Sequence, residues 1–440
     1  MTKIQHFLKH NIVGVVTVVS LFLLFFVLPS IFSGSDLLLN VNRLMIILVG
    51  LTYIIYKYMM FRQNYPNFKF AESTTLVNVL GSVIAIVIGL IFGLILMFFV
   101  SPANAMPGFF TILKGGFNNL KSLGNMIYFS VPIILTGLSV AFAFRTGLFN
   151  IGATGQLTMG AFAAVFIGVR GGFLGDIHPL LHWGVAVLGA GIAGGIWGAI
   201  PGILKAYRNV NEVVASIMLN YVAMYLNTIL ITTYIYNVDY ARALDIERTS
   251  ATPTFNLDLL FPTSSVNGGI VVAVIIVIIL YVILNKTTFG YELKAVGFNR
   301  DASKYAGMNA KRNIVYSMMI SGAVAGIAGA MMFLVVGKHL KPENILLQEG
   351  FTGIAISLLG LSNPIGVLLA GLFYGSLQQG GYYMQLYDFK PEIIDIIIAV
   401  IIYASALALF LQTFVIRRLK AREMTIDAKK VVEQEKEGDK

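Results

Sequence analysis

Residues 290–312 read GYELKAVGFNRDASKYAGMNAKR, and they separate two long apolar stretches, 269–284 and 313–336. Seven of these side chains are charged, and five of the seven are Lys or Arg. Loops that join membrane helices on the cytoplasmic side are enriched in Lys and Arg. The sequence therefore predicts two membrane-spanning helices that are joined by a basic loop facing the cytoplasm.

The middle of this loop predicts a short amphipathic helix. Residues Asn299 to Ala306 contain neither Gly nor Pro, and Gly307 follows in the position that commonly ends a helix. We expect an apolar face made of Leu293, Val296, Tyr305 and Met308. Such a helix at the inner mouth of a membrane bundle is a good contact for a soluble partner. The alternative is an ordinary basic loop that only fixes the topology.

Composition excludes several classes of protein. The chain is 57% hydrophobic and only 12% charged, and its mean hydropathy is +0.80, which is incompatible with a soluble globular domain. The net charge of +10 is dispersed among loops without interleaved aromatic residues, so we expect no nucleic-acid partner. Cysteine is absent and the histidines are scattered, so we expect neither a metal site nor a cofactor.

Apolar stretches of about the length that crosses a bilayer recur along the whole chain. The predicted fold is an all-α polytopic membrane protein with about 10–12 transmembrane helices. Phe351–Leu361 is too short to cross comfortably and predicts a half-helix. The predicted spans are Asn11–Ile31, Leu44–Phe61, Leu76–Val100, Asn125–Phe144, Ile151–Val169, Trp183–Leu204, Val213–Tyr234, Gly269–Leu284, Asn313–Val336, Phe351–Leu361, Pro364–Gln379 and Pro391–Thr413.

The distribution of Lys and Arg predicts that both termini lie in the cytoplasm. Residues 1–70 form an extra pair of helices with a linker, residues 71–423 form the core, and residues 424–440 form a charged tail that we expect to be disordered. Within the core, residues 286–312 are the inner loop. The outer loop, 236–267, is either a platform for an extracytoplasmic protein or a solvated connector.

Polar residues interrupt the apolar pattern after Arg145. Asn150, Gly152, Thr154 and Gln156 lie where a helix begins, and a broken helix of this kind can line a polar path inside a bundle. Residues 351–364 look like a counterpart in the second half, which suggests a weak internal two-half repeat. The alternative is that Asn and Gln only cap helices here.

A further polar set lies on the predicted span that follows Asn211. Asn220 and Tyr221, together with Phe149, offer hydrogen bonds and stacking surfaces for a sugar or a base. The ordinary alternative is hydrogen bonding between helices. The glycines at 191, 195, 198 and 202 and those at 322, 326 and 329 are spaced as small residues that allow close helix crossings, within one subunit or between two.

Two stretches resemble a known family. Residues 288–309, TFGYELKAVGFNRDASKYAGMN, look like the cytoplasmic coupling segment of the ribose-type ABC importer permeases. Residues 145–161, RTGLFNIGATGQLTMGA, are more similar to the nucleoside and simple-sugar branch, although Thr154 stands where that branch usually has Gly or Glu. The resemblance runs from about Ser73 to Leu419 and implies that the positions docking into the ATPase are Gly297, Asn299, Ala302, Tyr305, Ala306, Gly307 and Asn309.

The resemblance implies a permease subunit of a bacterial importer in the cytoplasmic membrane. Its partners would be ABC ATPase subunits, a second permease subunit, an extracytoplasmic substrate-binding lipoprotein and membrane lipid. Nucleosides are the implied cargo, and ribose or another simple sugar is the alternative. The chain has no phosphate-binding loop of its own, so we expect a transport subunit without catalytic residues.

Two other classes remain open from the residues alone. An ion-coupled secondary transporter would need an ionisable residue at membrane depth, and the predicted spans offer none that is convincing. The third class is a membrane scaffold or enzyme without transport activity. Uptake by this chain alone under an ion gradient would distinguish the secondary transporter from a subunit that depends on an ATPase.

Overall fold

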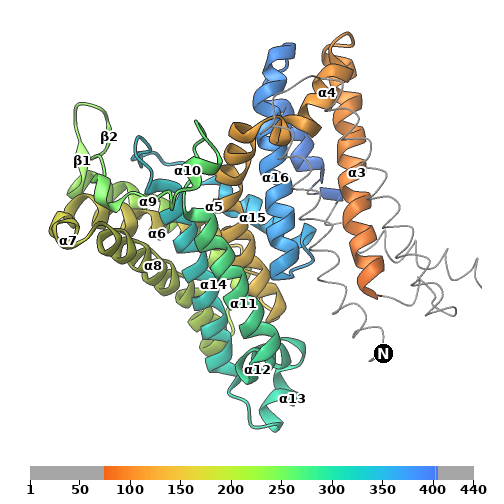
Figure 1. Ribbon diagram of the computed structural model, residues 1–440. Coiled ribbons are helices and arrows are strands. Elements are labelled where there is room, and N and C mark those ends of the chain that lie inside the picture. The colour runs from red at the N-terminus through yellow and green to blue at the C-terminus, as the bar shows by residue number, and fades with distance from the viewer. Residues whose placement is uncertain (1–73, 402, 405–440) are drawn as a thin grey trace, which may run out of the picture.

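The computed structural model describes residues 74–401, 403 and 404. The predicted spans Asn11–Ile31 and Leu44–Phe61, the end of the last span and the tail 424–440 lie outside the described residues. The described part is almost entirely helical (Figure 1), which confirms the all-α polytopic class. Its elements are α3 (Thr74–Val100), α4 (Ala105–Lys114), η2 (Gly115–Phe117), α5 (Leu120–Arg145), α6 (Ala153–Arg170), α7 (Gly172–Ile177), α8 (Pro179–Arg208), α9 (Glu212–Tyr234), β1 (Tyr236–Asn237), β2 (Arg242–Ala243), η3 (Arg248–Ser250), α10 (Leu257–Leu260), α11 (Gly269–Lys286), α12 (Thr288–Phe298), α13 (Arg300–Tyr305), α14 (Ala310–Phe333), α15 (Gln348–Leu359), α16 (Pro364–Met384), η4 (Gln385–Tyr387) and a helical stretch at 392–401.

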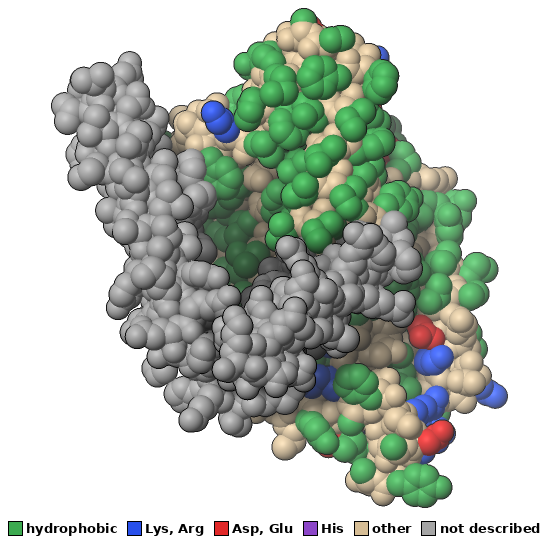
Figure 2. All heavy atoms as spheres, turned by 90° about the vertical axis from the view of Figure 1, so that its right-hand side faces the viewer, with side chains coloured by type: hydrophobic (Ala, Val, Ile, Leu, Met, Phe, Trp, Pro, Cys, Tyr) green, Lys and Arg blue, Asp and Glu red, His purple; other side chains and the backbone are tan. Residues whose placement is uncertain are grey.

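Six of the described helices are long and apolar enough to cross a membrane. Burial separates them into central and peripheral helices. In α5 and α14, 72% and 67% of the most apolar window is buried, whereas the value for α3 is 22%. The core of the bundle is therefore built around α5 and α14, and α3 presents most of its apolar surface outward, as Figure 2 shows for this side of the molecule.

Helices α8 and α14 cross in backbone contact. A Cβ atom added at Gly194 would overlap the carbonyl oxygen of Gly322, and one added at Gly326 would overlap that of Ala190. Small residues allow such an approach because nothing stands between the two backbones. The predicted packing role of the two glycine stripes is confirmed, and this packing lies within one chain.

Figure 1 shows that α7, β1, β2 and α10 lie at one end of the bundle and that α12 and α13 lie at the other. The segment 236–267 folds back onto the helix ends. Ala243 N–H donates to Leu340 O at 2.8 Å, and Thr252 N–H donates to Leu334 O at 2.8 Å. This segment is therefore a fixed surface of the bundle rather than a loose connector.

Some predicted boundaries and faces need correction. α5 begins at Leu120, five residues before the predicted Asn125. α15 runs from Gln348 to Leu359 and has only 12 residues, as expected of a half-helix. The expected apolar face of the inner loop is wrong for Tyr305, which is 95% exposed, while Leu293 and Val296 are buried. The reason is that extended backbone at Asn299 (φ −153°) separates α12 from α13, so the two helices do not share one face.

Candidate functional site

The short helix α13 projects from the inner-loop end of the bundle. The Asn299 side chain caps it by accepting hydrogen bonds from the N–H groups of Asp301 and Ala302, at 3.1 and 2.9 Å. Gly307 follows with φ +79°, a conformation that glycine adopts at little cost. Phe298 and Tyr305 are 91% and 95% exposed. Aromatic residues are enriched at protein-docking surfaces, so these two exposed side chains make this end a candidate docking surface.

We call residues 297–309 the coupling surface. In Figure 2, charged side chains gather in the lower part of the molecule, toward the end where Figure 1 shows α12 and α13, and the part above is largely hydrophobic. All of the predicted ATPase-contacting positions are exposed there; they are Gly297, Asn299, Ala302, Tyr305, Ala306, Gly307 and Asn309. Their role in docking stays a prediction, but the structure brings them together on one accessible turn.

The coupling surface and the helix α12 that leads into it contact three long helices. Arg300 donates to the carbonyl oxygen of Ala206 near the end of α8 at 3.1 Å. Asn313 in the first turn of α14 donates to Glu292 at 3.1 Å. Gly297 lies against the end of α5, where an added Cβ would lie 2.5 Å from the Thr146 carbonyl carbon. Helix α12 is therefore in direct contact with the ends of α5 and α14, and α13 with the end of α8.

Beyond Arg145 the chain turns back into the bundle instead of leaving it. Gly147 has φ +74°, and Asn150 then donates to the Ser321 hydroxyl at 2.7 Å. Ser321 is eleven residues beyond Ala310, where α14 begins, which corresponds to roughly 16 Å at 1.5 Å per residue. The following helix, α6, therefore begins near the middle of the membrane-spanning bundle, as predicted for a broken helix.

Buried amides hold this break together. Asn150 donates to Gln156 Oε1 at 2.8 Å, and Gln156 donates back to Asn150 Oδ1 at 3.1 Å. Asn220 accepts from Gly155 N–H at 2.9 Å and donates to Ile151 O at 3.0 Å. These bonds satisfy backbone and side-chain groups that a broken helix leaves open. In this conformation the amides act as caps and interhelical links, and their contact with a substrate stays a prediction.

The remaining predicted path residues are divided between the interior and the surface. Thr154 is 0% exposed, its Oγ1 has no hydrogen-bond partner, and it lies directly against Gly350. Phe149 and Tyr221 are 38% and 49% exposed, and Phe149 stacks on Phe144 at a centroid distance of 4.8 Å. The contact between Thr154 and Gly350 brings the N-termini of α6 and α15 together inside the bundle.

A cavity of about 200 Å³, which the sequence did not predict, lies between α5, α14, α15 and α16 toward the opposite, outer-loop end. Glu349 lies in the first turn of α15 and lines this cavity. The only sequence signal was the polar pair Tyr374 and Gln378 in an apolar stretch. The lining residues are Tyr128, Phe129, Pro132, Ile133, Met331, Met332, Lys338, Glu349, Tyr374 and Gln378.

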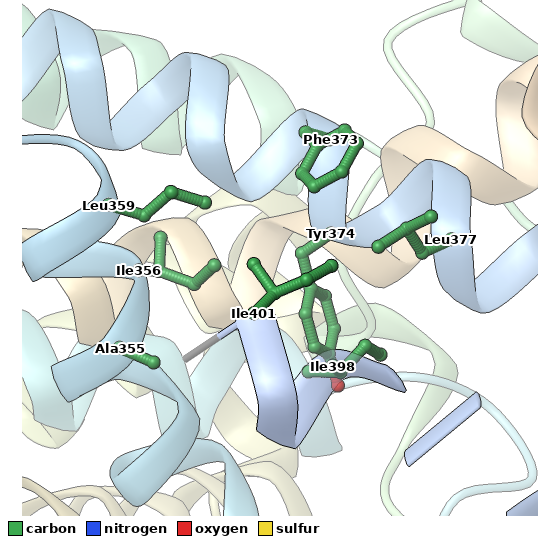
Figure 3. A pocket seen from close by; sticks show the side chains of 8 residues that line it. All are labelled: Ala355, Ile356, Leu359, Phe373, Tyr374, Leu377, Ile398 and Ile401. Atoms are coloured by element: carbon green, nitrogen blue, oxygen red, sulfur yellow. The ribbon is translucent and has the colours of Figure 1, made fainter. Parts of the chain in front are cut away.

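A second hollow lies behind Tyr374 and is shown in Figure 3. It is lined almost entirely by aliphatic side chains of α15, α16 and residues 398–401, and its volume is about 10 Å³. That space holds at most one water molecule. It is a packing gap, and it leaves the outer-end cavity as the stronger candidate for a solute.

Comparison with known proteins identifies the family. Residues 122–406 match a family described as branched-chain amino acid transport system / permease component. The guanosine ABC transporter permease protein NupP of Bacillus subtilis is 40% identical over 328 residues, which cover 74% of this chain and 92% of that protein. The nucleoside ABC transporter permease protein NupB of Lactococcus lactis is 34% identical over 329 residues, covering 73% and 90%.

A glucose ABC transporter permease protein of Haloferax volcanii is 31% identical over 285 residues, which cover 62% of this chain and 73% of that protein. No solved structure matches the chain. The family match spans most of the described bundle, including the coupling surface, the broken helix and the outer-end cavity. The chain therefore belongs to the branched-chain amino acid transport permease family of ABC transporters, as a multi-pass membrane protein.

Proposed function

We propose that this chain is the membrane subunit of an ATP-driven importer that carries nucleosides into a bacterial cell. The single observation that carries this proposal is the coupling surface, where Phe298 and Tyr305 are 91% and 95% exposed on a turn braced to α8 and α14. The names of the relatives NupP and NupB support nucleosides as the cargo. ATP hydrolysis belongs to a separate subunit that docks on this turn.

The orientation follows from charge. The coupling surface faces the cytoplasm, because Lys and Arg concentrate in the loops at that end of the bundle. Both termini lie on the same side of the membrane. The segment 236–267, which is hydrogen-bonded to the ends of α6 and α14, receives an extracytoplasmic substrate-binding lipoprotein. A second permease subunit, identical or related, completes the transporter.

The contacts suggest how ATPase movement reaches the cargo path. Displacement of the coupling surface acts through Gly297 on Thr146 and Gly147, immediately before the break. The break segment then moves the start of α6 relative to the start of α15, which touch at Thr154 and Gly350. Alternating access is opening and closing around that junction. The path residues are Phe149, Asn150, Gly152, Thr154, Gln156, Asn220 and Tyr221.

The docking role is tested by copurification and uptake. Tyr305→Asp places a charge in the centre of the docking surface, and we expect the ATPase subunit to be lost from the purified complex and radiolabelled guanosine uptake to fall about tenfold or more. Tyr382→Asp is the matched control, because Tyr382 is 67% exposed in the last turn of α16, at the opposite end. Normal ATPase copurification with Tyr305→Asp would contradict the proposal.

A simple sugar is the second candidate cargo, since the glucose permease of Haloferax volcanii is 31% identical over its matched region. Competition of unlabelled guanosine, ribose and glucose against labelled guanosine distinguishes the two. We expect guanosine alone to compete. If ribose or glucose competes at the same concentration, the cargo class is simple sugars.

An ion-coupled secondary transporter needs an ionisable residue that its coupling ion can reach. Glu349 is an acidic group that lines a cavity at the outer-loop end, so this class is tested directly. Proteoliposomes that contain this chain without an ATPase settle the matter. We expect no guanosine accumulation under a proton gradient. Accumulation there would show a secondary transporter and overturn the ATP-driven assignment.

A further inference from the structure

The outer-end cavity has walls of two chemical kinds. Tyr128 and Phe129 from α5 and Tyr374 from α16 present aromatic rings, while Glu349, Gln378 and Lys338 present polar groups. Sites for small organic solutes combine apolar or aromatic walls with a few placed polar groups. The apolar hollow of Figure 3 lacks such a set of placed polar groups.

The polar groups of this cavity are positioned by their neighbours. The Gln378 amide donates to the Tyr374 hydroxyl at 2.9 Å, one helical turn away. Lys338 lies over the Tyr128 ring at 5.0 Å from its centroid, a distance at which a cation is attracted to an aromatic face. Glu349 is fixed in the first turn of α15, next to the contact between Gly350 and Thr154. The cavity floor is therefore linked to the junction of the two broken helices.

The charged side chains in the cavity lining restrict the class of ligand that the cavity can bind. The lining holds one carboxylate, Glu349, and one ammonium group, Lys338, so the cavity has no excess of positive charge for a phosphate. A neutral solute with hydroxyl groups suits it better, because a carboxylate has two oxygens and accepts hydrogen bonds from two neighbouring hydroxyls. The aromatic walls suit a flat ring, which stacks on a Tyr face.

Size adds a second restriction. The cavity of about 200 Å³ is smaller than the roughly 300–1,000 Å³ of typical pockets for drug-sized ligands. It accommodates one ring system of a nucleoside and leaves the other in the mouth. Glu349 lies next to the helix junction, at the inner end of the cavity. Tyr128 lies under the exposed Lys338, at the mouth of the cavity. The pentose, which binds Glu349, therefore enters before the base.

We propose that this cavity is a cargo-binding site in which Glu349 binds the neighbouring 2′- and 3′-hydroxyls of a ribonucleoside and Tyr128 stacks on its base. The proposal rests on the proposed nucleoside import and adds the residues that select the cargo. Lys338 leaves the Tyr128 face when the base arrives. Binding next to Gly350 places the cargo against the junction that alternating access opens.

The test compares guanosine with 2′,3′-dideoxyguanosine, which lacks both hydroxyls, in proteoliposomes that contain the complete importer. Glu349→Gln is expected to raise KM for guanosine about tenfold, because a hydrogen bond to a charged acceptor is lost, and to leave KM for the dideoxy compound unchanged. The matched control is Glu343→Gln, which removes the same charge from a carboxylate paired with Lys341 at 3.4 Å outside the cavity. An equal change in KM for both compounds would overturn the proposal.

Tyr128 is tested by a conservative pair. Tyr128→Leu is expected to raise both KM values about fivefold or more, since it removes the ring on which the base stacks, whereas Tyr128→Phe, which keeps the ring, is expected to raise them less. Copurification of the ATPase shows that each variant assembles. Wild-type KM values in Tyr128→Leu would contradict the stacking role.

Direct occupancy is measurable because the chain has no cysteine. Phe129→Cys places a thiol on the cavity wall, where the native side chain is 43% exposed, and guanosine is expected to slow its reaction with a membrane-impermeant maleimide. Val238→Cys, at an exposed residue of the β1–β2 turn, is the unprotected control. If wild-type complexes import guanosine but guanosine fails to protect Phe129→Cys, the cavity site is wrong while the proposed function stands. Absence of guanosine import by the wild-type complex would instead contradict the proposed function.

Discussion

Gly297 leaves no room for a side chain at the base of the broken helix. An added Cβ would lie 2.5 Å from the carbonyl carbon and oxygen of Thr146 and 2.7 Å from Gly147 N. These are backbone atoms at the end of α5, so they cannot rotate away as a flexible side chain would. A methyl group at this position therefore separates the coupling surface from the break segment.

We expect Gly297→Ala to lower the stability of the permease by about 1–3 kcal/mol, the usual cost of overpacking, and to reduce uptake more strongly than ATPase copurification. Thermal unfolding in detergent and transport by the reconstituted complex are the measurements. Gly184→Ala is the control, because an added Cβ there meets nothing within 4 Å and alanine favours the helix. An unfolding midpoint and uptake equal to those of wild type would contradict the steric argument.

Asn150 shows how a single amide holds the break. Its side chain donates to Gln156 at 2.8 Å and to Ser321 at 2.7 Å, and it accepts from Gly152 N–H at 3.0 Å. The group is 0% exposed, so its partners have no access to water in this conformation. Removing it leaves several polar groups unsatisfied at once.

Asn150→Ala should destabilise the protein by about 1–3 kcal/mol, because a buried polar group without a partner costs that much. A second change, Gln156→Leu, should recover part of this loss by removing the orphaned amide. Asn344→Ala is the control at an exposed residue, and thermal unfolding of all four variants is the measurement. If the double variant loses more unfolding free energy than the two single variants lose together, Asn150 and Gln156 do not stabilise each other by hydrogen bonding.

At the scale of whole elements, α8 and α14 determine how tightly the bundle closes. A Cβ added at Gly326 would overlap the backbone of α8 at Ala190, whereas one added at Gly191 would lie 3.3 Å from the side chain of Ile327. A backbone neighbour cannot yield, and a flexible side chain can. The two glycines of one crossing therefore differ in how well they tolerate a methyl group.

Gly326→Ala should force the two helices apart and strongly reduce the amount of monodisperse protein obtained from membranes. Gly191→Ala should cost less than about 1 kcal/mol, since Ile327 can change its rotamer. Size-exclusion chromatography and thermal unfolding of both variants test this order. The opposite order would mean that α8 and α14 do not cross as the structure shows.

At the scale of the whole molecule, the two ends carry different tasks. The coupling surface lies at one end and the segment 236–267 at the other (Figure 1). The outer-end cavity lies between α5, α14, α15 and α16. The broken helix connects the coupling surface with this cavity through contacts at Gly297 and at Gly350. In the alternating access proposed above, the ATPase acts at one end and the cargo binds toward the other, so these contacts would connect the two proposed sites.

Thiol labelling in intact cells and in inverted vesicles tests the orientation. Tyr305→Cys should react with a membrane-impermeant maleimide only in inverted vesicles, and Tyr240→Cys on the β1–β2 turn only in intact cells. In the permease expressed without its partner subunits, both positions are well exposed, at 95% and 67%, so access depends on the side of the membrane. Labelling of Tyr305→Cys in intact cells would reverse the proposed orientation.

Much of the fold could be predicted because a bilayer restricts what a sequence can form. Apolar stretches of bilayer length must be helical, since only a helix satisfies its own backbone in lipid. The break after Arg145, the short helix α15 and the end of α13 before Gly307 followed local rules for Gly, Asn and Pro. The glycine spacing likewise indicated close helix crossings before the partners were known.

The sequence by itself determined the helices, their breaks and the exposed basic turn, because each depends on residues that are close along the chain. Only the tertiary structure decided that Asn150, Gln156 and Asn220 bind one another and the backbone, and that Glu349 faces a cavity with Tyr128 and Gln378. These groups come from helices far apart in the chain, and helical periodicity reveals which face a residue occupies but not which helix covers it.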